Sequence, residues 1–378
     1  MVSVSSKPNV LMVCPKPPWF GGGVERMVAE LAKRLKNTFS LKVYCTSDSS
    51  DQLGDHTWEG ILVKVFQTYS FAYQLSLPLY RSIRGEKEVC LIHAHNYSTL
   101  IPLTVTLAQN DIPVIINPHF HRRAETKFNS LLRQVYDLWP GAYPLRRARL
   151  VVCNSNAERQ SLLRKFPDLQ GVQVIYNGVD LDRIRLAEPY TATSSKVILC
   201  VSRLVRYKNV HLILHALKYL PQEYKMVVIG TGSEMESLQA LVAKLGLQGR
   251  VDFLGNVPDG ELHRWYRTAT VFAHLSEIES FGMTCIEALA AGTPVVANDD
   301  RAGLKETIEL FHPYICAVDA TRSSPQQIAN VIEEAGHIKV DASLHGFDWD
   351  EIANQFRVLY SQVIESRGRG CYDGGKFD

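Results

Sequence analysis

The stretch VLMVCPKPPWFGGGVERMVAELAKRLK, residues 10–36, contains one complete pattern of strand, loop and helix. Its apolar run Val10–Cys14 predicts a buried strand, and three consecutive glycines lie in the loop that follows. In the helix expected at Val24–Lys36, the apolar positions are spaced four, three, one and three residues apart, which is one face of a 3.6-residue period. The stretch therefore predicts a βα unit.

The same alternation of strand and helix patterns continues along the chain, which predicts an α/β fold with parallel sheets covered on both faces. In the first half, strands are expected at Val10–Cys14, Leu41–Cys45, Ile61–Val65, Val89–Ile92, Val114–Asn117, Leu150–Cys153 and Val172–Tyr176. A second series is expected at Val197–Val201, Met226–Ile229, Val251–Leu254, Val271–His274 and Val295–Ala297.

The polar stretch AEPYTATSS, residues 187–195, separates the two series and marks a domain boundary. We expect two tandem doubly wound, Rossmann-like domains, residues 1–187 and 196–340, facing across a cleft. The run WDEIANQFRVLYSQVIES predicts a long helix within residues 341–366, and residues 367–378 are expected to be a flexible tail. Ligands of such sheets bind beyond the carboxyl ends of the strands, so the cleft is the expected site.

The composition is that of an ordinary globular protein, with 46% hydrophobic and 21% charged residues. The formal net charge of +2 gives no reason to expect a nucleic-acid partner. No apolar run is long enough for a membrane span, and the first is too short for a signal peptide. The eight cysteines are scattered without a CxxC pair, which favours free buried thiols in a cytoplasmic protein.

The segment VSRLVRYKNV, residues 201–210, places Arg203 and Lys208 just beyond a strand. A guanidinium beside an ammonium can hold a diphosphate without a metal. The alternative is a solvated basic loop.

The segment EIESFGMTCIEALAAG, residues 277–292, carries two carboxylates, Glu279 and Glu287, with seven residues between them. We expect Ser280 to cap a helix whose first N–H groups, from Gly282 to Thr284, can receive an anion. This pattern favours a sugar at Glu279, a phosphate at the helix start and a second hydroxylated group at Glu287. The alternative is a surface charge followed by a residue on a helix face.

These motifs occur in the same order in one family. The triple glycine, SRLVRYKN, IGTGSE at residues 229–234, VDFLGNVP at 251–258 and the two spaced glutamates together resemble the retaining glycosyltransferases of the GT-B fold, family 4. The likeness covers nearly the whole chain, and it is weaker in the first half.

The resemblance implies specific roles. Arg203 and Lys208 would hold the donor diphosphate, Glu279 the donor sugar and Glu287 the ribose. Other donor-binding positions implied by the likeness are Gly22, Gly23, Gly230, Gly232, Phe253, Gly255, Val257, Phe281, Gly282, Met283 and Thr284. Of these, Gly22 and Gly23 would face the phosphates or the acceptor. The terminal helix would cross back onto the first domain.

His119, in NPHFHRR at the end of a first-domain strand, matches the histidine that the family places near the anomeric carbon. An imidazole there could donate to the sugar or stabilise positive charge, and a nucleophile is not implied. His121 is the rival in the same string, and a structural histidine at a strand end is the alternative.

Metal ligands are not expected. The pairs His93 with His95 and His119 with His121 alternate as strand neighbours do, but no third ligand stands at a recognisable spacing. The DLD string at residues 180–182 resembles the metal-binding DxD of other glycosyltransferases, yet here it follows a strand and suits a turn. No other cofactor is expected.

The segment from His119 to Lys165 is strongly basic, with ten Arg or Lys against three acidic residues. An apolar stripe at helical spacing runs through it: Phe128, Leu131, Leu132, Val135, Leu138 and Trp139. Such a segment could lie on an anionic membrane and present the site to a lipid-linked acceptor. The alternative, which we prefer, is that the stripe packs on the sheet.

The sequence thus predicts a metal-independent, retaining glycosyltransferase that moves a hexose from a nucleoside diphosphate sugar to a hydroxyl acceptor. It is expected in the cytoplasm, with a peripheral position on the inner membrane face as the variant that the basic segment leaves open. A nucleotide-sugar epimerase or a phosphorylase of the same fold, or a non-catalytic nucleotide-sugar-binding subunit, remain alternatives. The presence of Glu279, Arg203 and Lys208 argues against the last.

Overall fold

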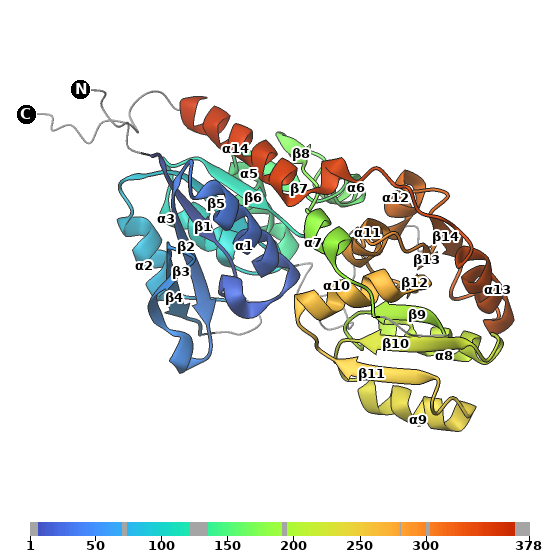
Figure 1. The fold of residues 1–378 in the computed structure, drawn as a ribbon. Coiled ribbons are helices and arrows are strands. Elements are labelled where there is room, and N and C mark those ends of the chain that lie inside the picture. The colour runs from blue at the N-terminus through green and yellow to red at the C-terminus, as the bar shows by residue number, and fades with distance from the viewer. Residues whose placement is uncertain are drawn as a thin grey trace, which may run out of the picture. The chain divides into compact units, whose positions relative to one another are not determined.

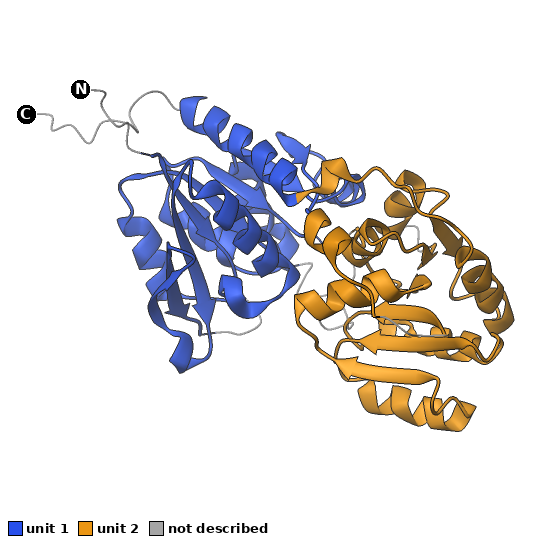
Figure 2. Ribbon diagram, in the orientation of Figure 1, with its two compact units in different colours: residues 1–178, 349–378 blue, residues 179–348 orange. Residues whose placement is uncertain are grey.

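The computed structural model describes residues 7–69, 74–120, 135–190, 195–279, 281–299 and 303–366. They form two compact units, coloured separately in Figure 2. Unit 1 comprises residues 1–178 together with 349–378, and unit 2 comprises residues 179–348. Each unit is a sheet with helices on both faces, so the α/β class expected from the sequence is confirmed.

Unit 1 is built on an eight-stranded sheet of order β3-β4-β2-β1-β5-β6-β7-β8, parallel except for β3. Its strands are β1 Asn9–Val13, β2 Ser40–Ser47, β3 Gly54–Trp58, β4 Ile61–Gln67, β5 Val89–His95, β6 Val114–Asn117, β7 Leu150–Cys153 and β8 Val172–Val174. Its helices are α1 Gly23–Leu35, α2 Leu77–Gly85, α3 Ile101–Ala108, α5 Ala142–Arg147, α6 Asn156–Lys165 and α14 Trp349–Ser366.

Alternation along the strands gives unit 1 two apolar layers. Val10 and Met12 of β1 face the layer that contains α1 and α14, whereas Leu11 and Val13 face the layer of α2, α3, α5 and α6. α14 belongs to this unit although it lies at the far end of the chain (Figure 1). Its Phe356 and Tyr360 are fully buried, because they pack with α1 and β5.

Unit 2 is built on a six-stranded, fully parallel sheet of order β11-β10-β9-β12-β13-β14. Its strands are β9 Lys196–Val201, β10 Tyr224–Ile229, β11 Val251–Gly255, β12 Val271–His274, β13 Val295–Asn298 and β14 Ile315–Val318. Its helices are α7 Leu181–Leu186, α8 Val210–Leu217, α9 Met235–Leu245, α10 Asp259–Thr268, α11 Met283–Ala290, α12 Gly303–Leu310 and α13 Pro325–Ala335. α8, α9 and α13 cover one face of the sheet, where their buried side chains join an apolar cluster with the strands.

The boundary between the units differs from the linker expected at residues 187–195. The first segment of unit 1 ends at Gly178, and α7, which follows it, already packs against α10 and α11 of unit 2. The reason is that Leu181 and Ile184 of α7 are buried in that contact, so the short helix belongs to the second core. Residues 341–348 also belong to unit 2, and only from Trp349 does the chain return to unit 1.

The described residues include seven of the eight cysteines, and Cys371 lies outside them. All seven carry free thiols, and six of the seven are buried. None of the helices described combines the length and the apolar character that a bilayer crossing requires.

Candidate functional site

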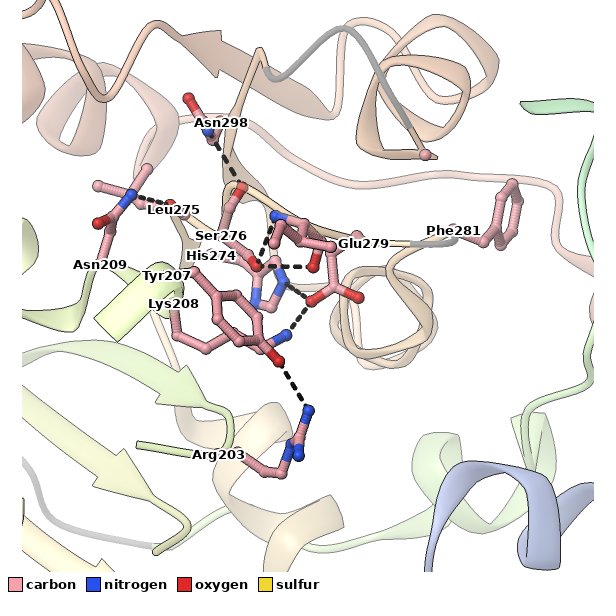
Figure 3. Close-up of polar contacts among 12 residues, drawn as sticks. Arg203, Tyr207, Lys208, Asn209, His274, Leu275, Ser276, Glu279, Phe281 and Asn298 are labelled. Atoms are coloured by element: carbon pink, nitrogen blue, oxygen red, sulfur yellow. Dashed lines mark hydrogen bonds and ion pairs between the residues drawn. The ribbon is translucent and has the colours of Figure 1, made fainter. Parts of the chain in front are cut away.

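The candidate donor site lies at the carboxyl ends of β9 and β12, which are neighbours in the sheet of unit 2. The loops that follow these strands are tied together. The Glu277 N–H donates to the Tyr207 carbonyl oxygen at 2.9 Å, and Asn209 Nδ2 donates to the Leu275 carbonyl oxygen at 3.1 Å. Residues far apart in the sequence therefore form one rigid constellation (Figure 3).

Glu279 is the centre of this constellation. Its Oε1 accepts a hydrogen bond from His274 Nε2 at 2.8 Å and is ion-paired with Lys208 Nζ. The side chains of Glu279, Lys208 and His274 are 18%, 11% and 4% exposed, so the pair is screened from bulk water. Burial disfavours the charged carboxylate, but the His274 hydrogen bond and the Lys208 charge hold the pKa of Glu279 well below its ordinary value. Glu279 is therefore an ionised acceptor with one edge exposed.

Arg203 and Lys208 do not form the simple cation pair expected from the sequence. Lys208 is paired with Glu279, whereas Arg203 is exposed and its Nη2 donates to the Tyr207 hydroxyl at 2.7 Å. Lys208 Nζ lies 5.5 Å from the centroid of the Tyr207 ring, so the same tyrosine contacts both cations. Arg203 is thus open to an anionic ligand, as is the exposed Arg206 of the same loop, whereas Lys208 is paired.

The start of α11 adds backbone donors to the same region. Its N-cap is Gly282, with φ of 78°, so the expectation that Ser280 caps this helix is wrong. A side chain at Gly282 would collide with Leu304, and only glycine adopts that φ without strain. Ser280 itself lies outside the described residues. Met283 and Thr284, both partly buried, begin the helix, and the first N–H groups of a helix lack intrahelical partners.

Two residues that the sequence analysis placed near the donor have inward-facing side chains. Phe281 stacks on Phe347 with ring centroids 5.6 Å apart, so it offers only its backbone to a ligand. Glu287 is 6% exposed, and its Oε2 accepts a hydrogen bond from the Tyr266 hydroxyl at 2.8 Å. A ribose at Glu287 would have to share that carboxylate with Tyr266.

The glycines of the IGTGSE segment allow two loops to approach each other closely. A Cβ at Gly230 would overlap the Ser202 carbonyl oxygen, and one at Gly232 would overlap that of Leu204. They therefore hold the loop after β10 against the loop that carries Arg203. The remaining donor candidates lie at the end of β11: Phe253 and Gly255 in the strand, and Val257 just after it, all partly buried.

The first-domain candidates lie in unit 1. Gly22 caps α1 and Gly23 begins it, and a Cβ at Gly22 would overlap the carboxylate of buried Glu25. His119 follows β6, is 9% exposed and has a φ of 47°. Its Nδ1 accepts from Asn154 Nδ2 at 2.9 Å. His121 lies outside the described residues.

The structure also describes His93, His95, His119 and the DLD string, which the sequence analysis considered as metal ligands. Among the described residues, no three His, Cys, Asp or Glu side chains are grouped so that they could hold a metal ion. His93 uses both ring nitrogens in hydrogen bonds, to Tyr360 and Asn117. The DLD string precedes and begins α7, where Asp180 makes no side-chain cap and Asp182 is exposed.

Residues 121–134 of the basic segment, among them Phe128, Leu131 and Leu132, lie outside the described residues. Val135, Leu138 and Trp139 are 58%, 78% and 55% exposed. These three side chains do not pack on the sheet, contrary to the preferred expectation for the stripe.

Sequence reasoning missed His274, Tyr207 and Asn209, which organise the site around Glu279. One signal was available, because His274 is a polar residue at the carboxyl end of a strand that is otherwise apolar. Asn209 gave none, because its partner Leu275 lies 66 positions away. Tyr207 gave none either, because the contact of its carbonyl oxygen with the Glu277 N–H joins two separate loops.

Two family descriptions match successive halves of the chain. The description "Glycosyltransferase Family 4" matches residues 21–183, and "Glycosyl transferases group 1" matches residues 185–340. The curated D-inositol 3-phosphate glycosyltransferase of Xylanimonas cellulosilytica is 27% identical, over 75% of this chain and 74% of its own. The N-acetylgalactosamine-N,N'-diacetylbacillosaminyl-diphospho-undecaprenol 4-alpha-N-acetylgalactosaminyltransferase of Campylobacter jejuni is also 27% identical, over 75% of this chain and 80% of its own.

Solved structures share the fold. HepE of Anabaena, in complex with UDP and glucose, has a TM-score of 0.73 at 23% identity, covering 94% of this chain and 100% of its own. Sucrose-phosphate synthase of Thermosynechococcus elongatus has a TM-score of 0.77 at 19% identity, covering 95% of this chain and 100% of its own. The likeness shows the GT-B fold.

Proposed function

The chain belongs to the group 1 glycosyltransferases, with an N-terminal half of glycosyltransferase family 4, and from this membership we propose the reaction in finer terms. It transfers a hexose from a nucleoside diphosphate sugar to a hydroxyl acceptor, with retention at the anomeric carbon and without a metal ion. The bond from the anomeric carbon to the diphosphate oxygen breaks, and the acceptor oxygen bonds from the same face. The acceptor proton passes to the departing phosphate oxygen.

The observation that carries this proposal is the ionised Glu279 beside the cations and the start of α11. Carboxylates accept hydrogen bonds from sugar hydroxyls, and charged acceptors form the stronger bonds. Arg203 and the first N–H groups of α11 supply positive potential for the phosphates, which supports departure of the diphosphate without a divalent cation. The His274 hydrogen bond and the Lys208 charge keep Glu279 ionised, because they lower its pKa against the effect of burial.

Unit 2 is assigned the donor, and unit 1, with His119, the acceptor side. The Campylobacter relative acts on a diphospho-undecaprenol-linked acceptor, and the Anabaena structure holds UDP with glucose. These likenesses support a UDP-sugar donor and a lipid-linked acceptor as the first candidates. The exposed Val135, Leu138 and Trp139, within a basic segment, support a reaction in the cytoplasm at the inner membrane face.

A thermal-shift screen tests the donor assignment. Sugars linked to UDP, GDP and ADP are compared with the bare nucleoside diphosphates, because a ligand that binds only the folded state raises the melting temperature. We expect one nucleotide series to raise it, and the intact sugar nucleotide to raise it more than the bare nucleotide. No shift with any series, together with no transfer to a lipid-linked or soluble hydroxyl acceptor, would contradict the proposal.

A further inference from the structure

A chain of buried hydrogen bonds runs through unit 1 from α14 to His119. The Tyr360 hydroxyl lies 2.6 Å from His93 Nδ1, and His93 Nε2 lies 2.6 Å from Asn117 Oδ1. Asn117 Nδ2 lies 3.0 Å from Asn154 Oδ1, and Asn154 Nδ2 lies 2.9 Å from His119 Nδ1. All five side chains are buried. We call this series the relay.

One carbonyl group decides the direction of the whole relay. Asn117 Nδ2 also donates to the Val152 carbonyl oxygen at 2.7 Å. A carbonyl oxygen only accepts, so this contact determines which end of the Asn117 amide carries the N–H groups. Its Oδ1 must then face His93, whose Nε2 must carry the proton. His93 Nδ1 is left as an acceptor for the Tyr360 hydroxyl.

The same reasoning continues toward His119. Asn117 Nδ2 donates to Asn154, so the Asn154 oxygen faces Asn117 and its NH₂ faces His119. An NH₂ group only donates, and His119 Nδ1 must therefore be unprotonated. The proton of the neutral ring is on Nε2. Protonation of Nδ1 would replace a hydrogen bond by two donors facing each other.

We propose that Asn117 and Asn154 are positioning residues that hold His119 as the Nε2–H tautomer, so that His119 serves as a neutral hydrogen-bond donor and not as a general base. The first part of this proposal concerns only the tautomer of the His119 ring. The second part rests on the proposed function, because it assigns the Nε2–H to an oxygen of the reacting sugar, phosphate or acceptor.

The backbone around His119 is held as firmly as its ring. The two oxygens of the Glu158 side chain accept from the Phe120 and Asn154 N–H groups, at 2.5 and 2.6 Å. One carboxyl group of α6 thus joins the loop after β6 to the loop after β7. It fixes His119 and its partner Asn154 relative to each other.

A second neighbour of the His119 ring is His95 of β5. Its Nδ1 lies 3.4 Å from His119 Nε2, and the rings stack with centroids 5.7 Å apart. This distance is long for a hydrogen bond, so a substrate oxygen would compete with it readily. Burial, followed by the nearby His93 and His119, lowers the pKa of His95, which therefore adds no charge beside His119. Over the part of the chain described, His95 Nε2 has no hydrogen-bond partner.

The tautomer can be measured directly on the full chain labelled with ¹⁵N-histidine. Nitrogen chemical shifts distinguish protonated from bare ring nitrogens, and a His119→Asn variant assigns the signal. We expect a bare Nδ1 and a protonated Nε2 at about neutral pH. A protonated Nδ1 in the parent protein overturns the proposal, and this measurement needs neither a ligand nor a folded relay variant.

An Asn154→Asp substitution then reverses the relay at its last bond. A carboxylate only accepts, so Nδ1 of His119 must take up a proton. Asn156→Asp is the matched control, because it is the same change two residues away at an exposed position. We expect the nitrogen signals of His119 to exchange roles in Asn154→Asp and to stay unchanged in Asn156→Asp. Unchanged signals in a folded Asn154→Asp overturn the proposal.

Turnover tests the second part separately. When Nδ1 holds the proton of the neutral ring, Nε2 no longer donates, so we expect kcat in Asn154→Asp to fall on the order of a hundredfold, the scale for one preorganised donor. Asn156→Asp should keep the parent's turnover. An altered tautomer with unchanged kcat would refute the role of His119 as a donor. If the parent transfers no sugar at all, the proposed function fails while the tautomer measurement still stands.

Discussion

The substitution Glu279→Gln separates the sugar from the phosphates as sources of donor affinity. It keeps the size of the side chain and removes its negative charge. We expect the nucleoside diphosphate sugar to bind more weakly, because only this ligand carries the hydroxyls that the carboxylate would hold. The bare nucleoside diphosphate should bind at least as tightly, because Lys208 loses its counter-charge and the local potential becomes more positive.

The size of the effect follows from the kind of bond that is lost. A hydrogen bond to a charged group contributes about 1.5–3 kcal/mol. At about 1.4 kcal/mol per tenfold change, the dissociation constant of the sugar nucleotide should rise roughly 10- to 150-fold. The constant for the bare nucleotide should fall or stay within a factor of about two, so the two ligands move in different directions.

Calorimetric titration of both ligands checks this prediction. Glu277→Gln is the control, since Glu277 lies in the same loop and its Oε1 accepts from Asn209 at 3.1 Å, a bond that glutamine can keep. Equal weakening of both ligands in Glu279→Gln, at an unchanged melting temperature, would refute the assignment of Glu279 to the sugar. Weakening accompanied by a lower melting temperature would show a packing defect, and would refute it as well.

Three further outcomes are expected. Arg203→Ala should remove roughly 2–4 kcal/mol of transition-state stabilisation, measured as a lower kcat/KM in steady-state kinetics. Turnover within twofold of the parent would show that Arg203 is not part of the donor site. Transfer should continue in EDTA, whereas complete loss with recovery on adding manganese would make Asp180 and Asp182 candidate ligands. Burial, opposed by the two backbone N–H bonds, raises the pKa of Glu158 to about 7 from 4.5, so the folded state favours the uncharged acid. Its contribution to the free energy of unfolding is therefore fully present below pH 4.5 and is lost as the pH rises from there through about 7, by roughly 3 kcal/mol. Urea denaturation at several pH values should show this loss in the parent and a flatter dependence in Glu158→Gln, and identical slopes would contradict it.

Strand positions were predictable wherever the apolar signal was strong. β6, β7 and β12 have the expected bounds because their residues are mostly apolar and almost entirely buried. β3 and β14 were not predicted, and both are edge strands. β3, with the sequence GDHTW, is largely exposed and carries no apolar run. The pattern that reveals central strands is therefore absent from β3. β14, with the sequence ICAV, carries a short apolar run that the sequence analysis did not recognise as a strand.

The site was predictable to the extent that it depends on local motifs. Glu279, Arg203 and the start of α11 were named as donor-site candidates from local motifs and from the family resemblance, and their roles stay predictions. The pairing of Lys208 with Glu279 and His274 was not predicted, because it joins loops after two different strands. The relay could not be predicted either, since the amide of Asn117 is oriented by a carbonyl group 35 residues away. Such contacts depend on which strands become neighbours.

The position of α14 has a consequence for the order in which the protein can fold during synthesis. Unit 2 is one uninterrupted segment, residues 179–348, and all of it precedes α14 in the chain. The apolar core of unit 1 instead includes Trp349, Phe356 and Tyr360, which leave the ribosome only after all of unit 2. The second unit can therefore complete its core while the core of the first unit still lacks α14. A nascent chain halted before residue 349 would expose the apolar face of β1, β2 and β5, and chaperones should bind it there.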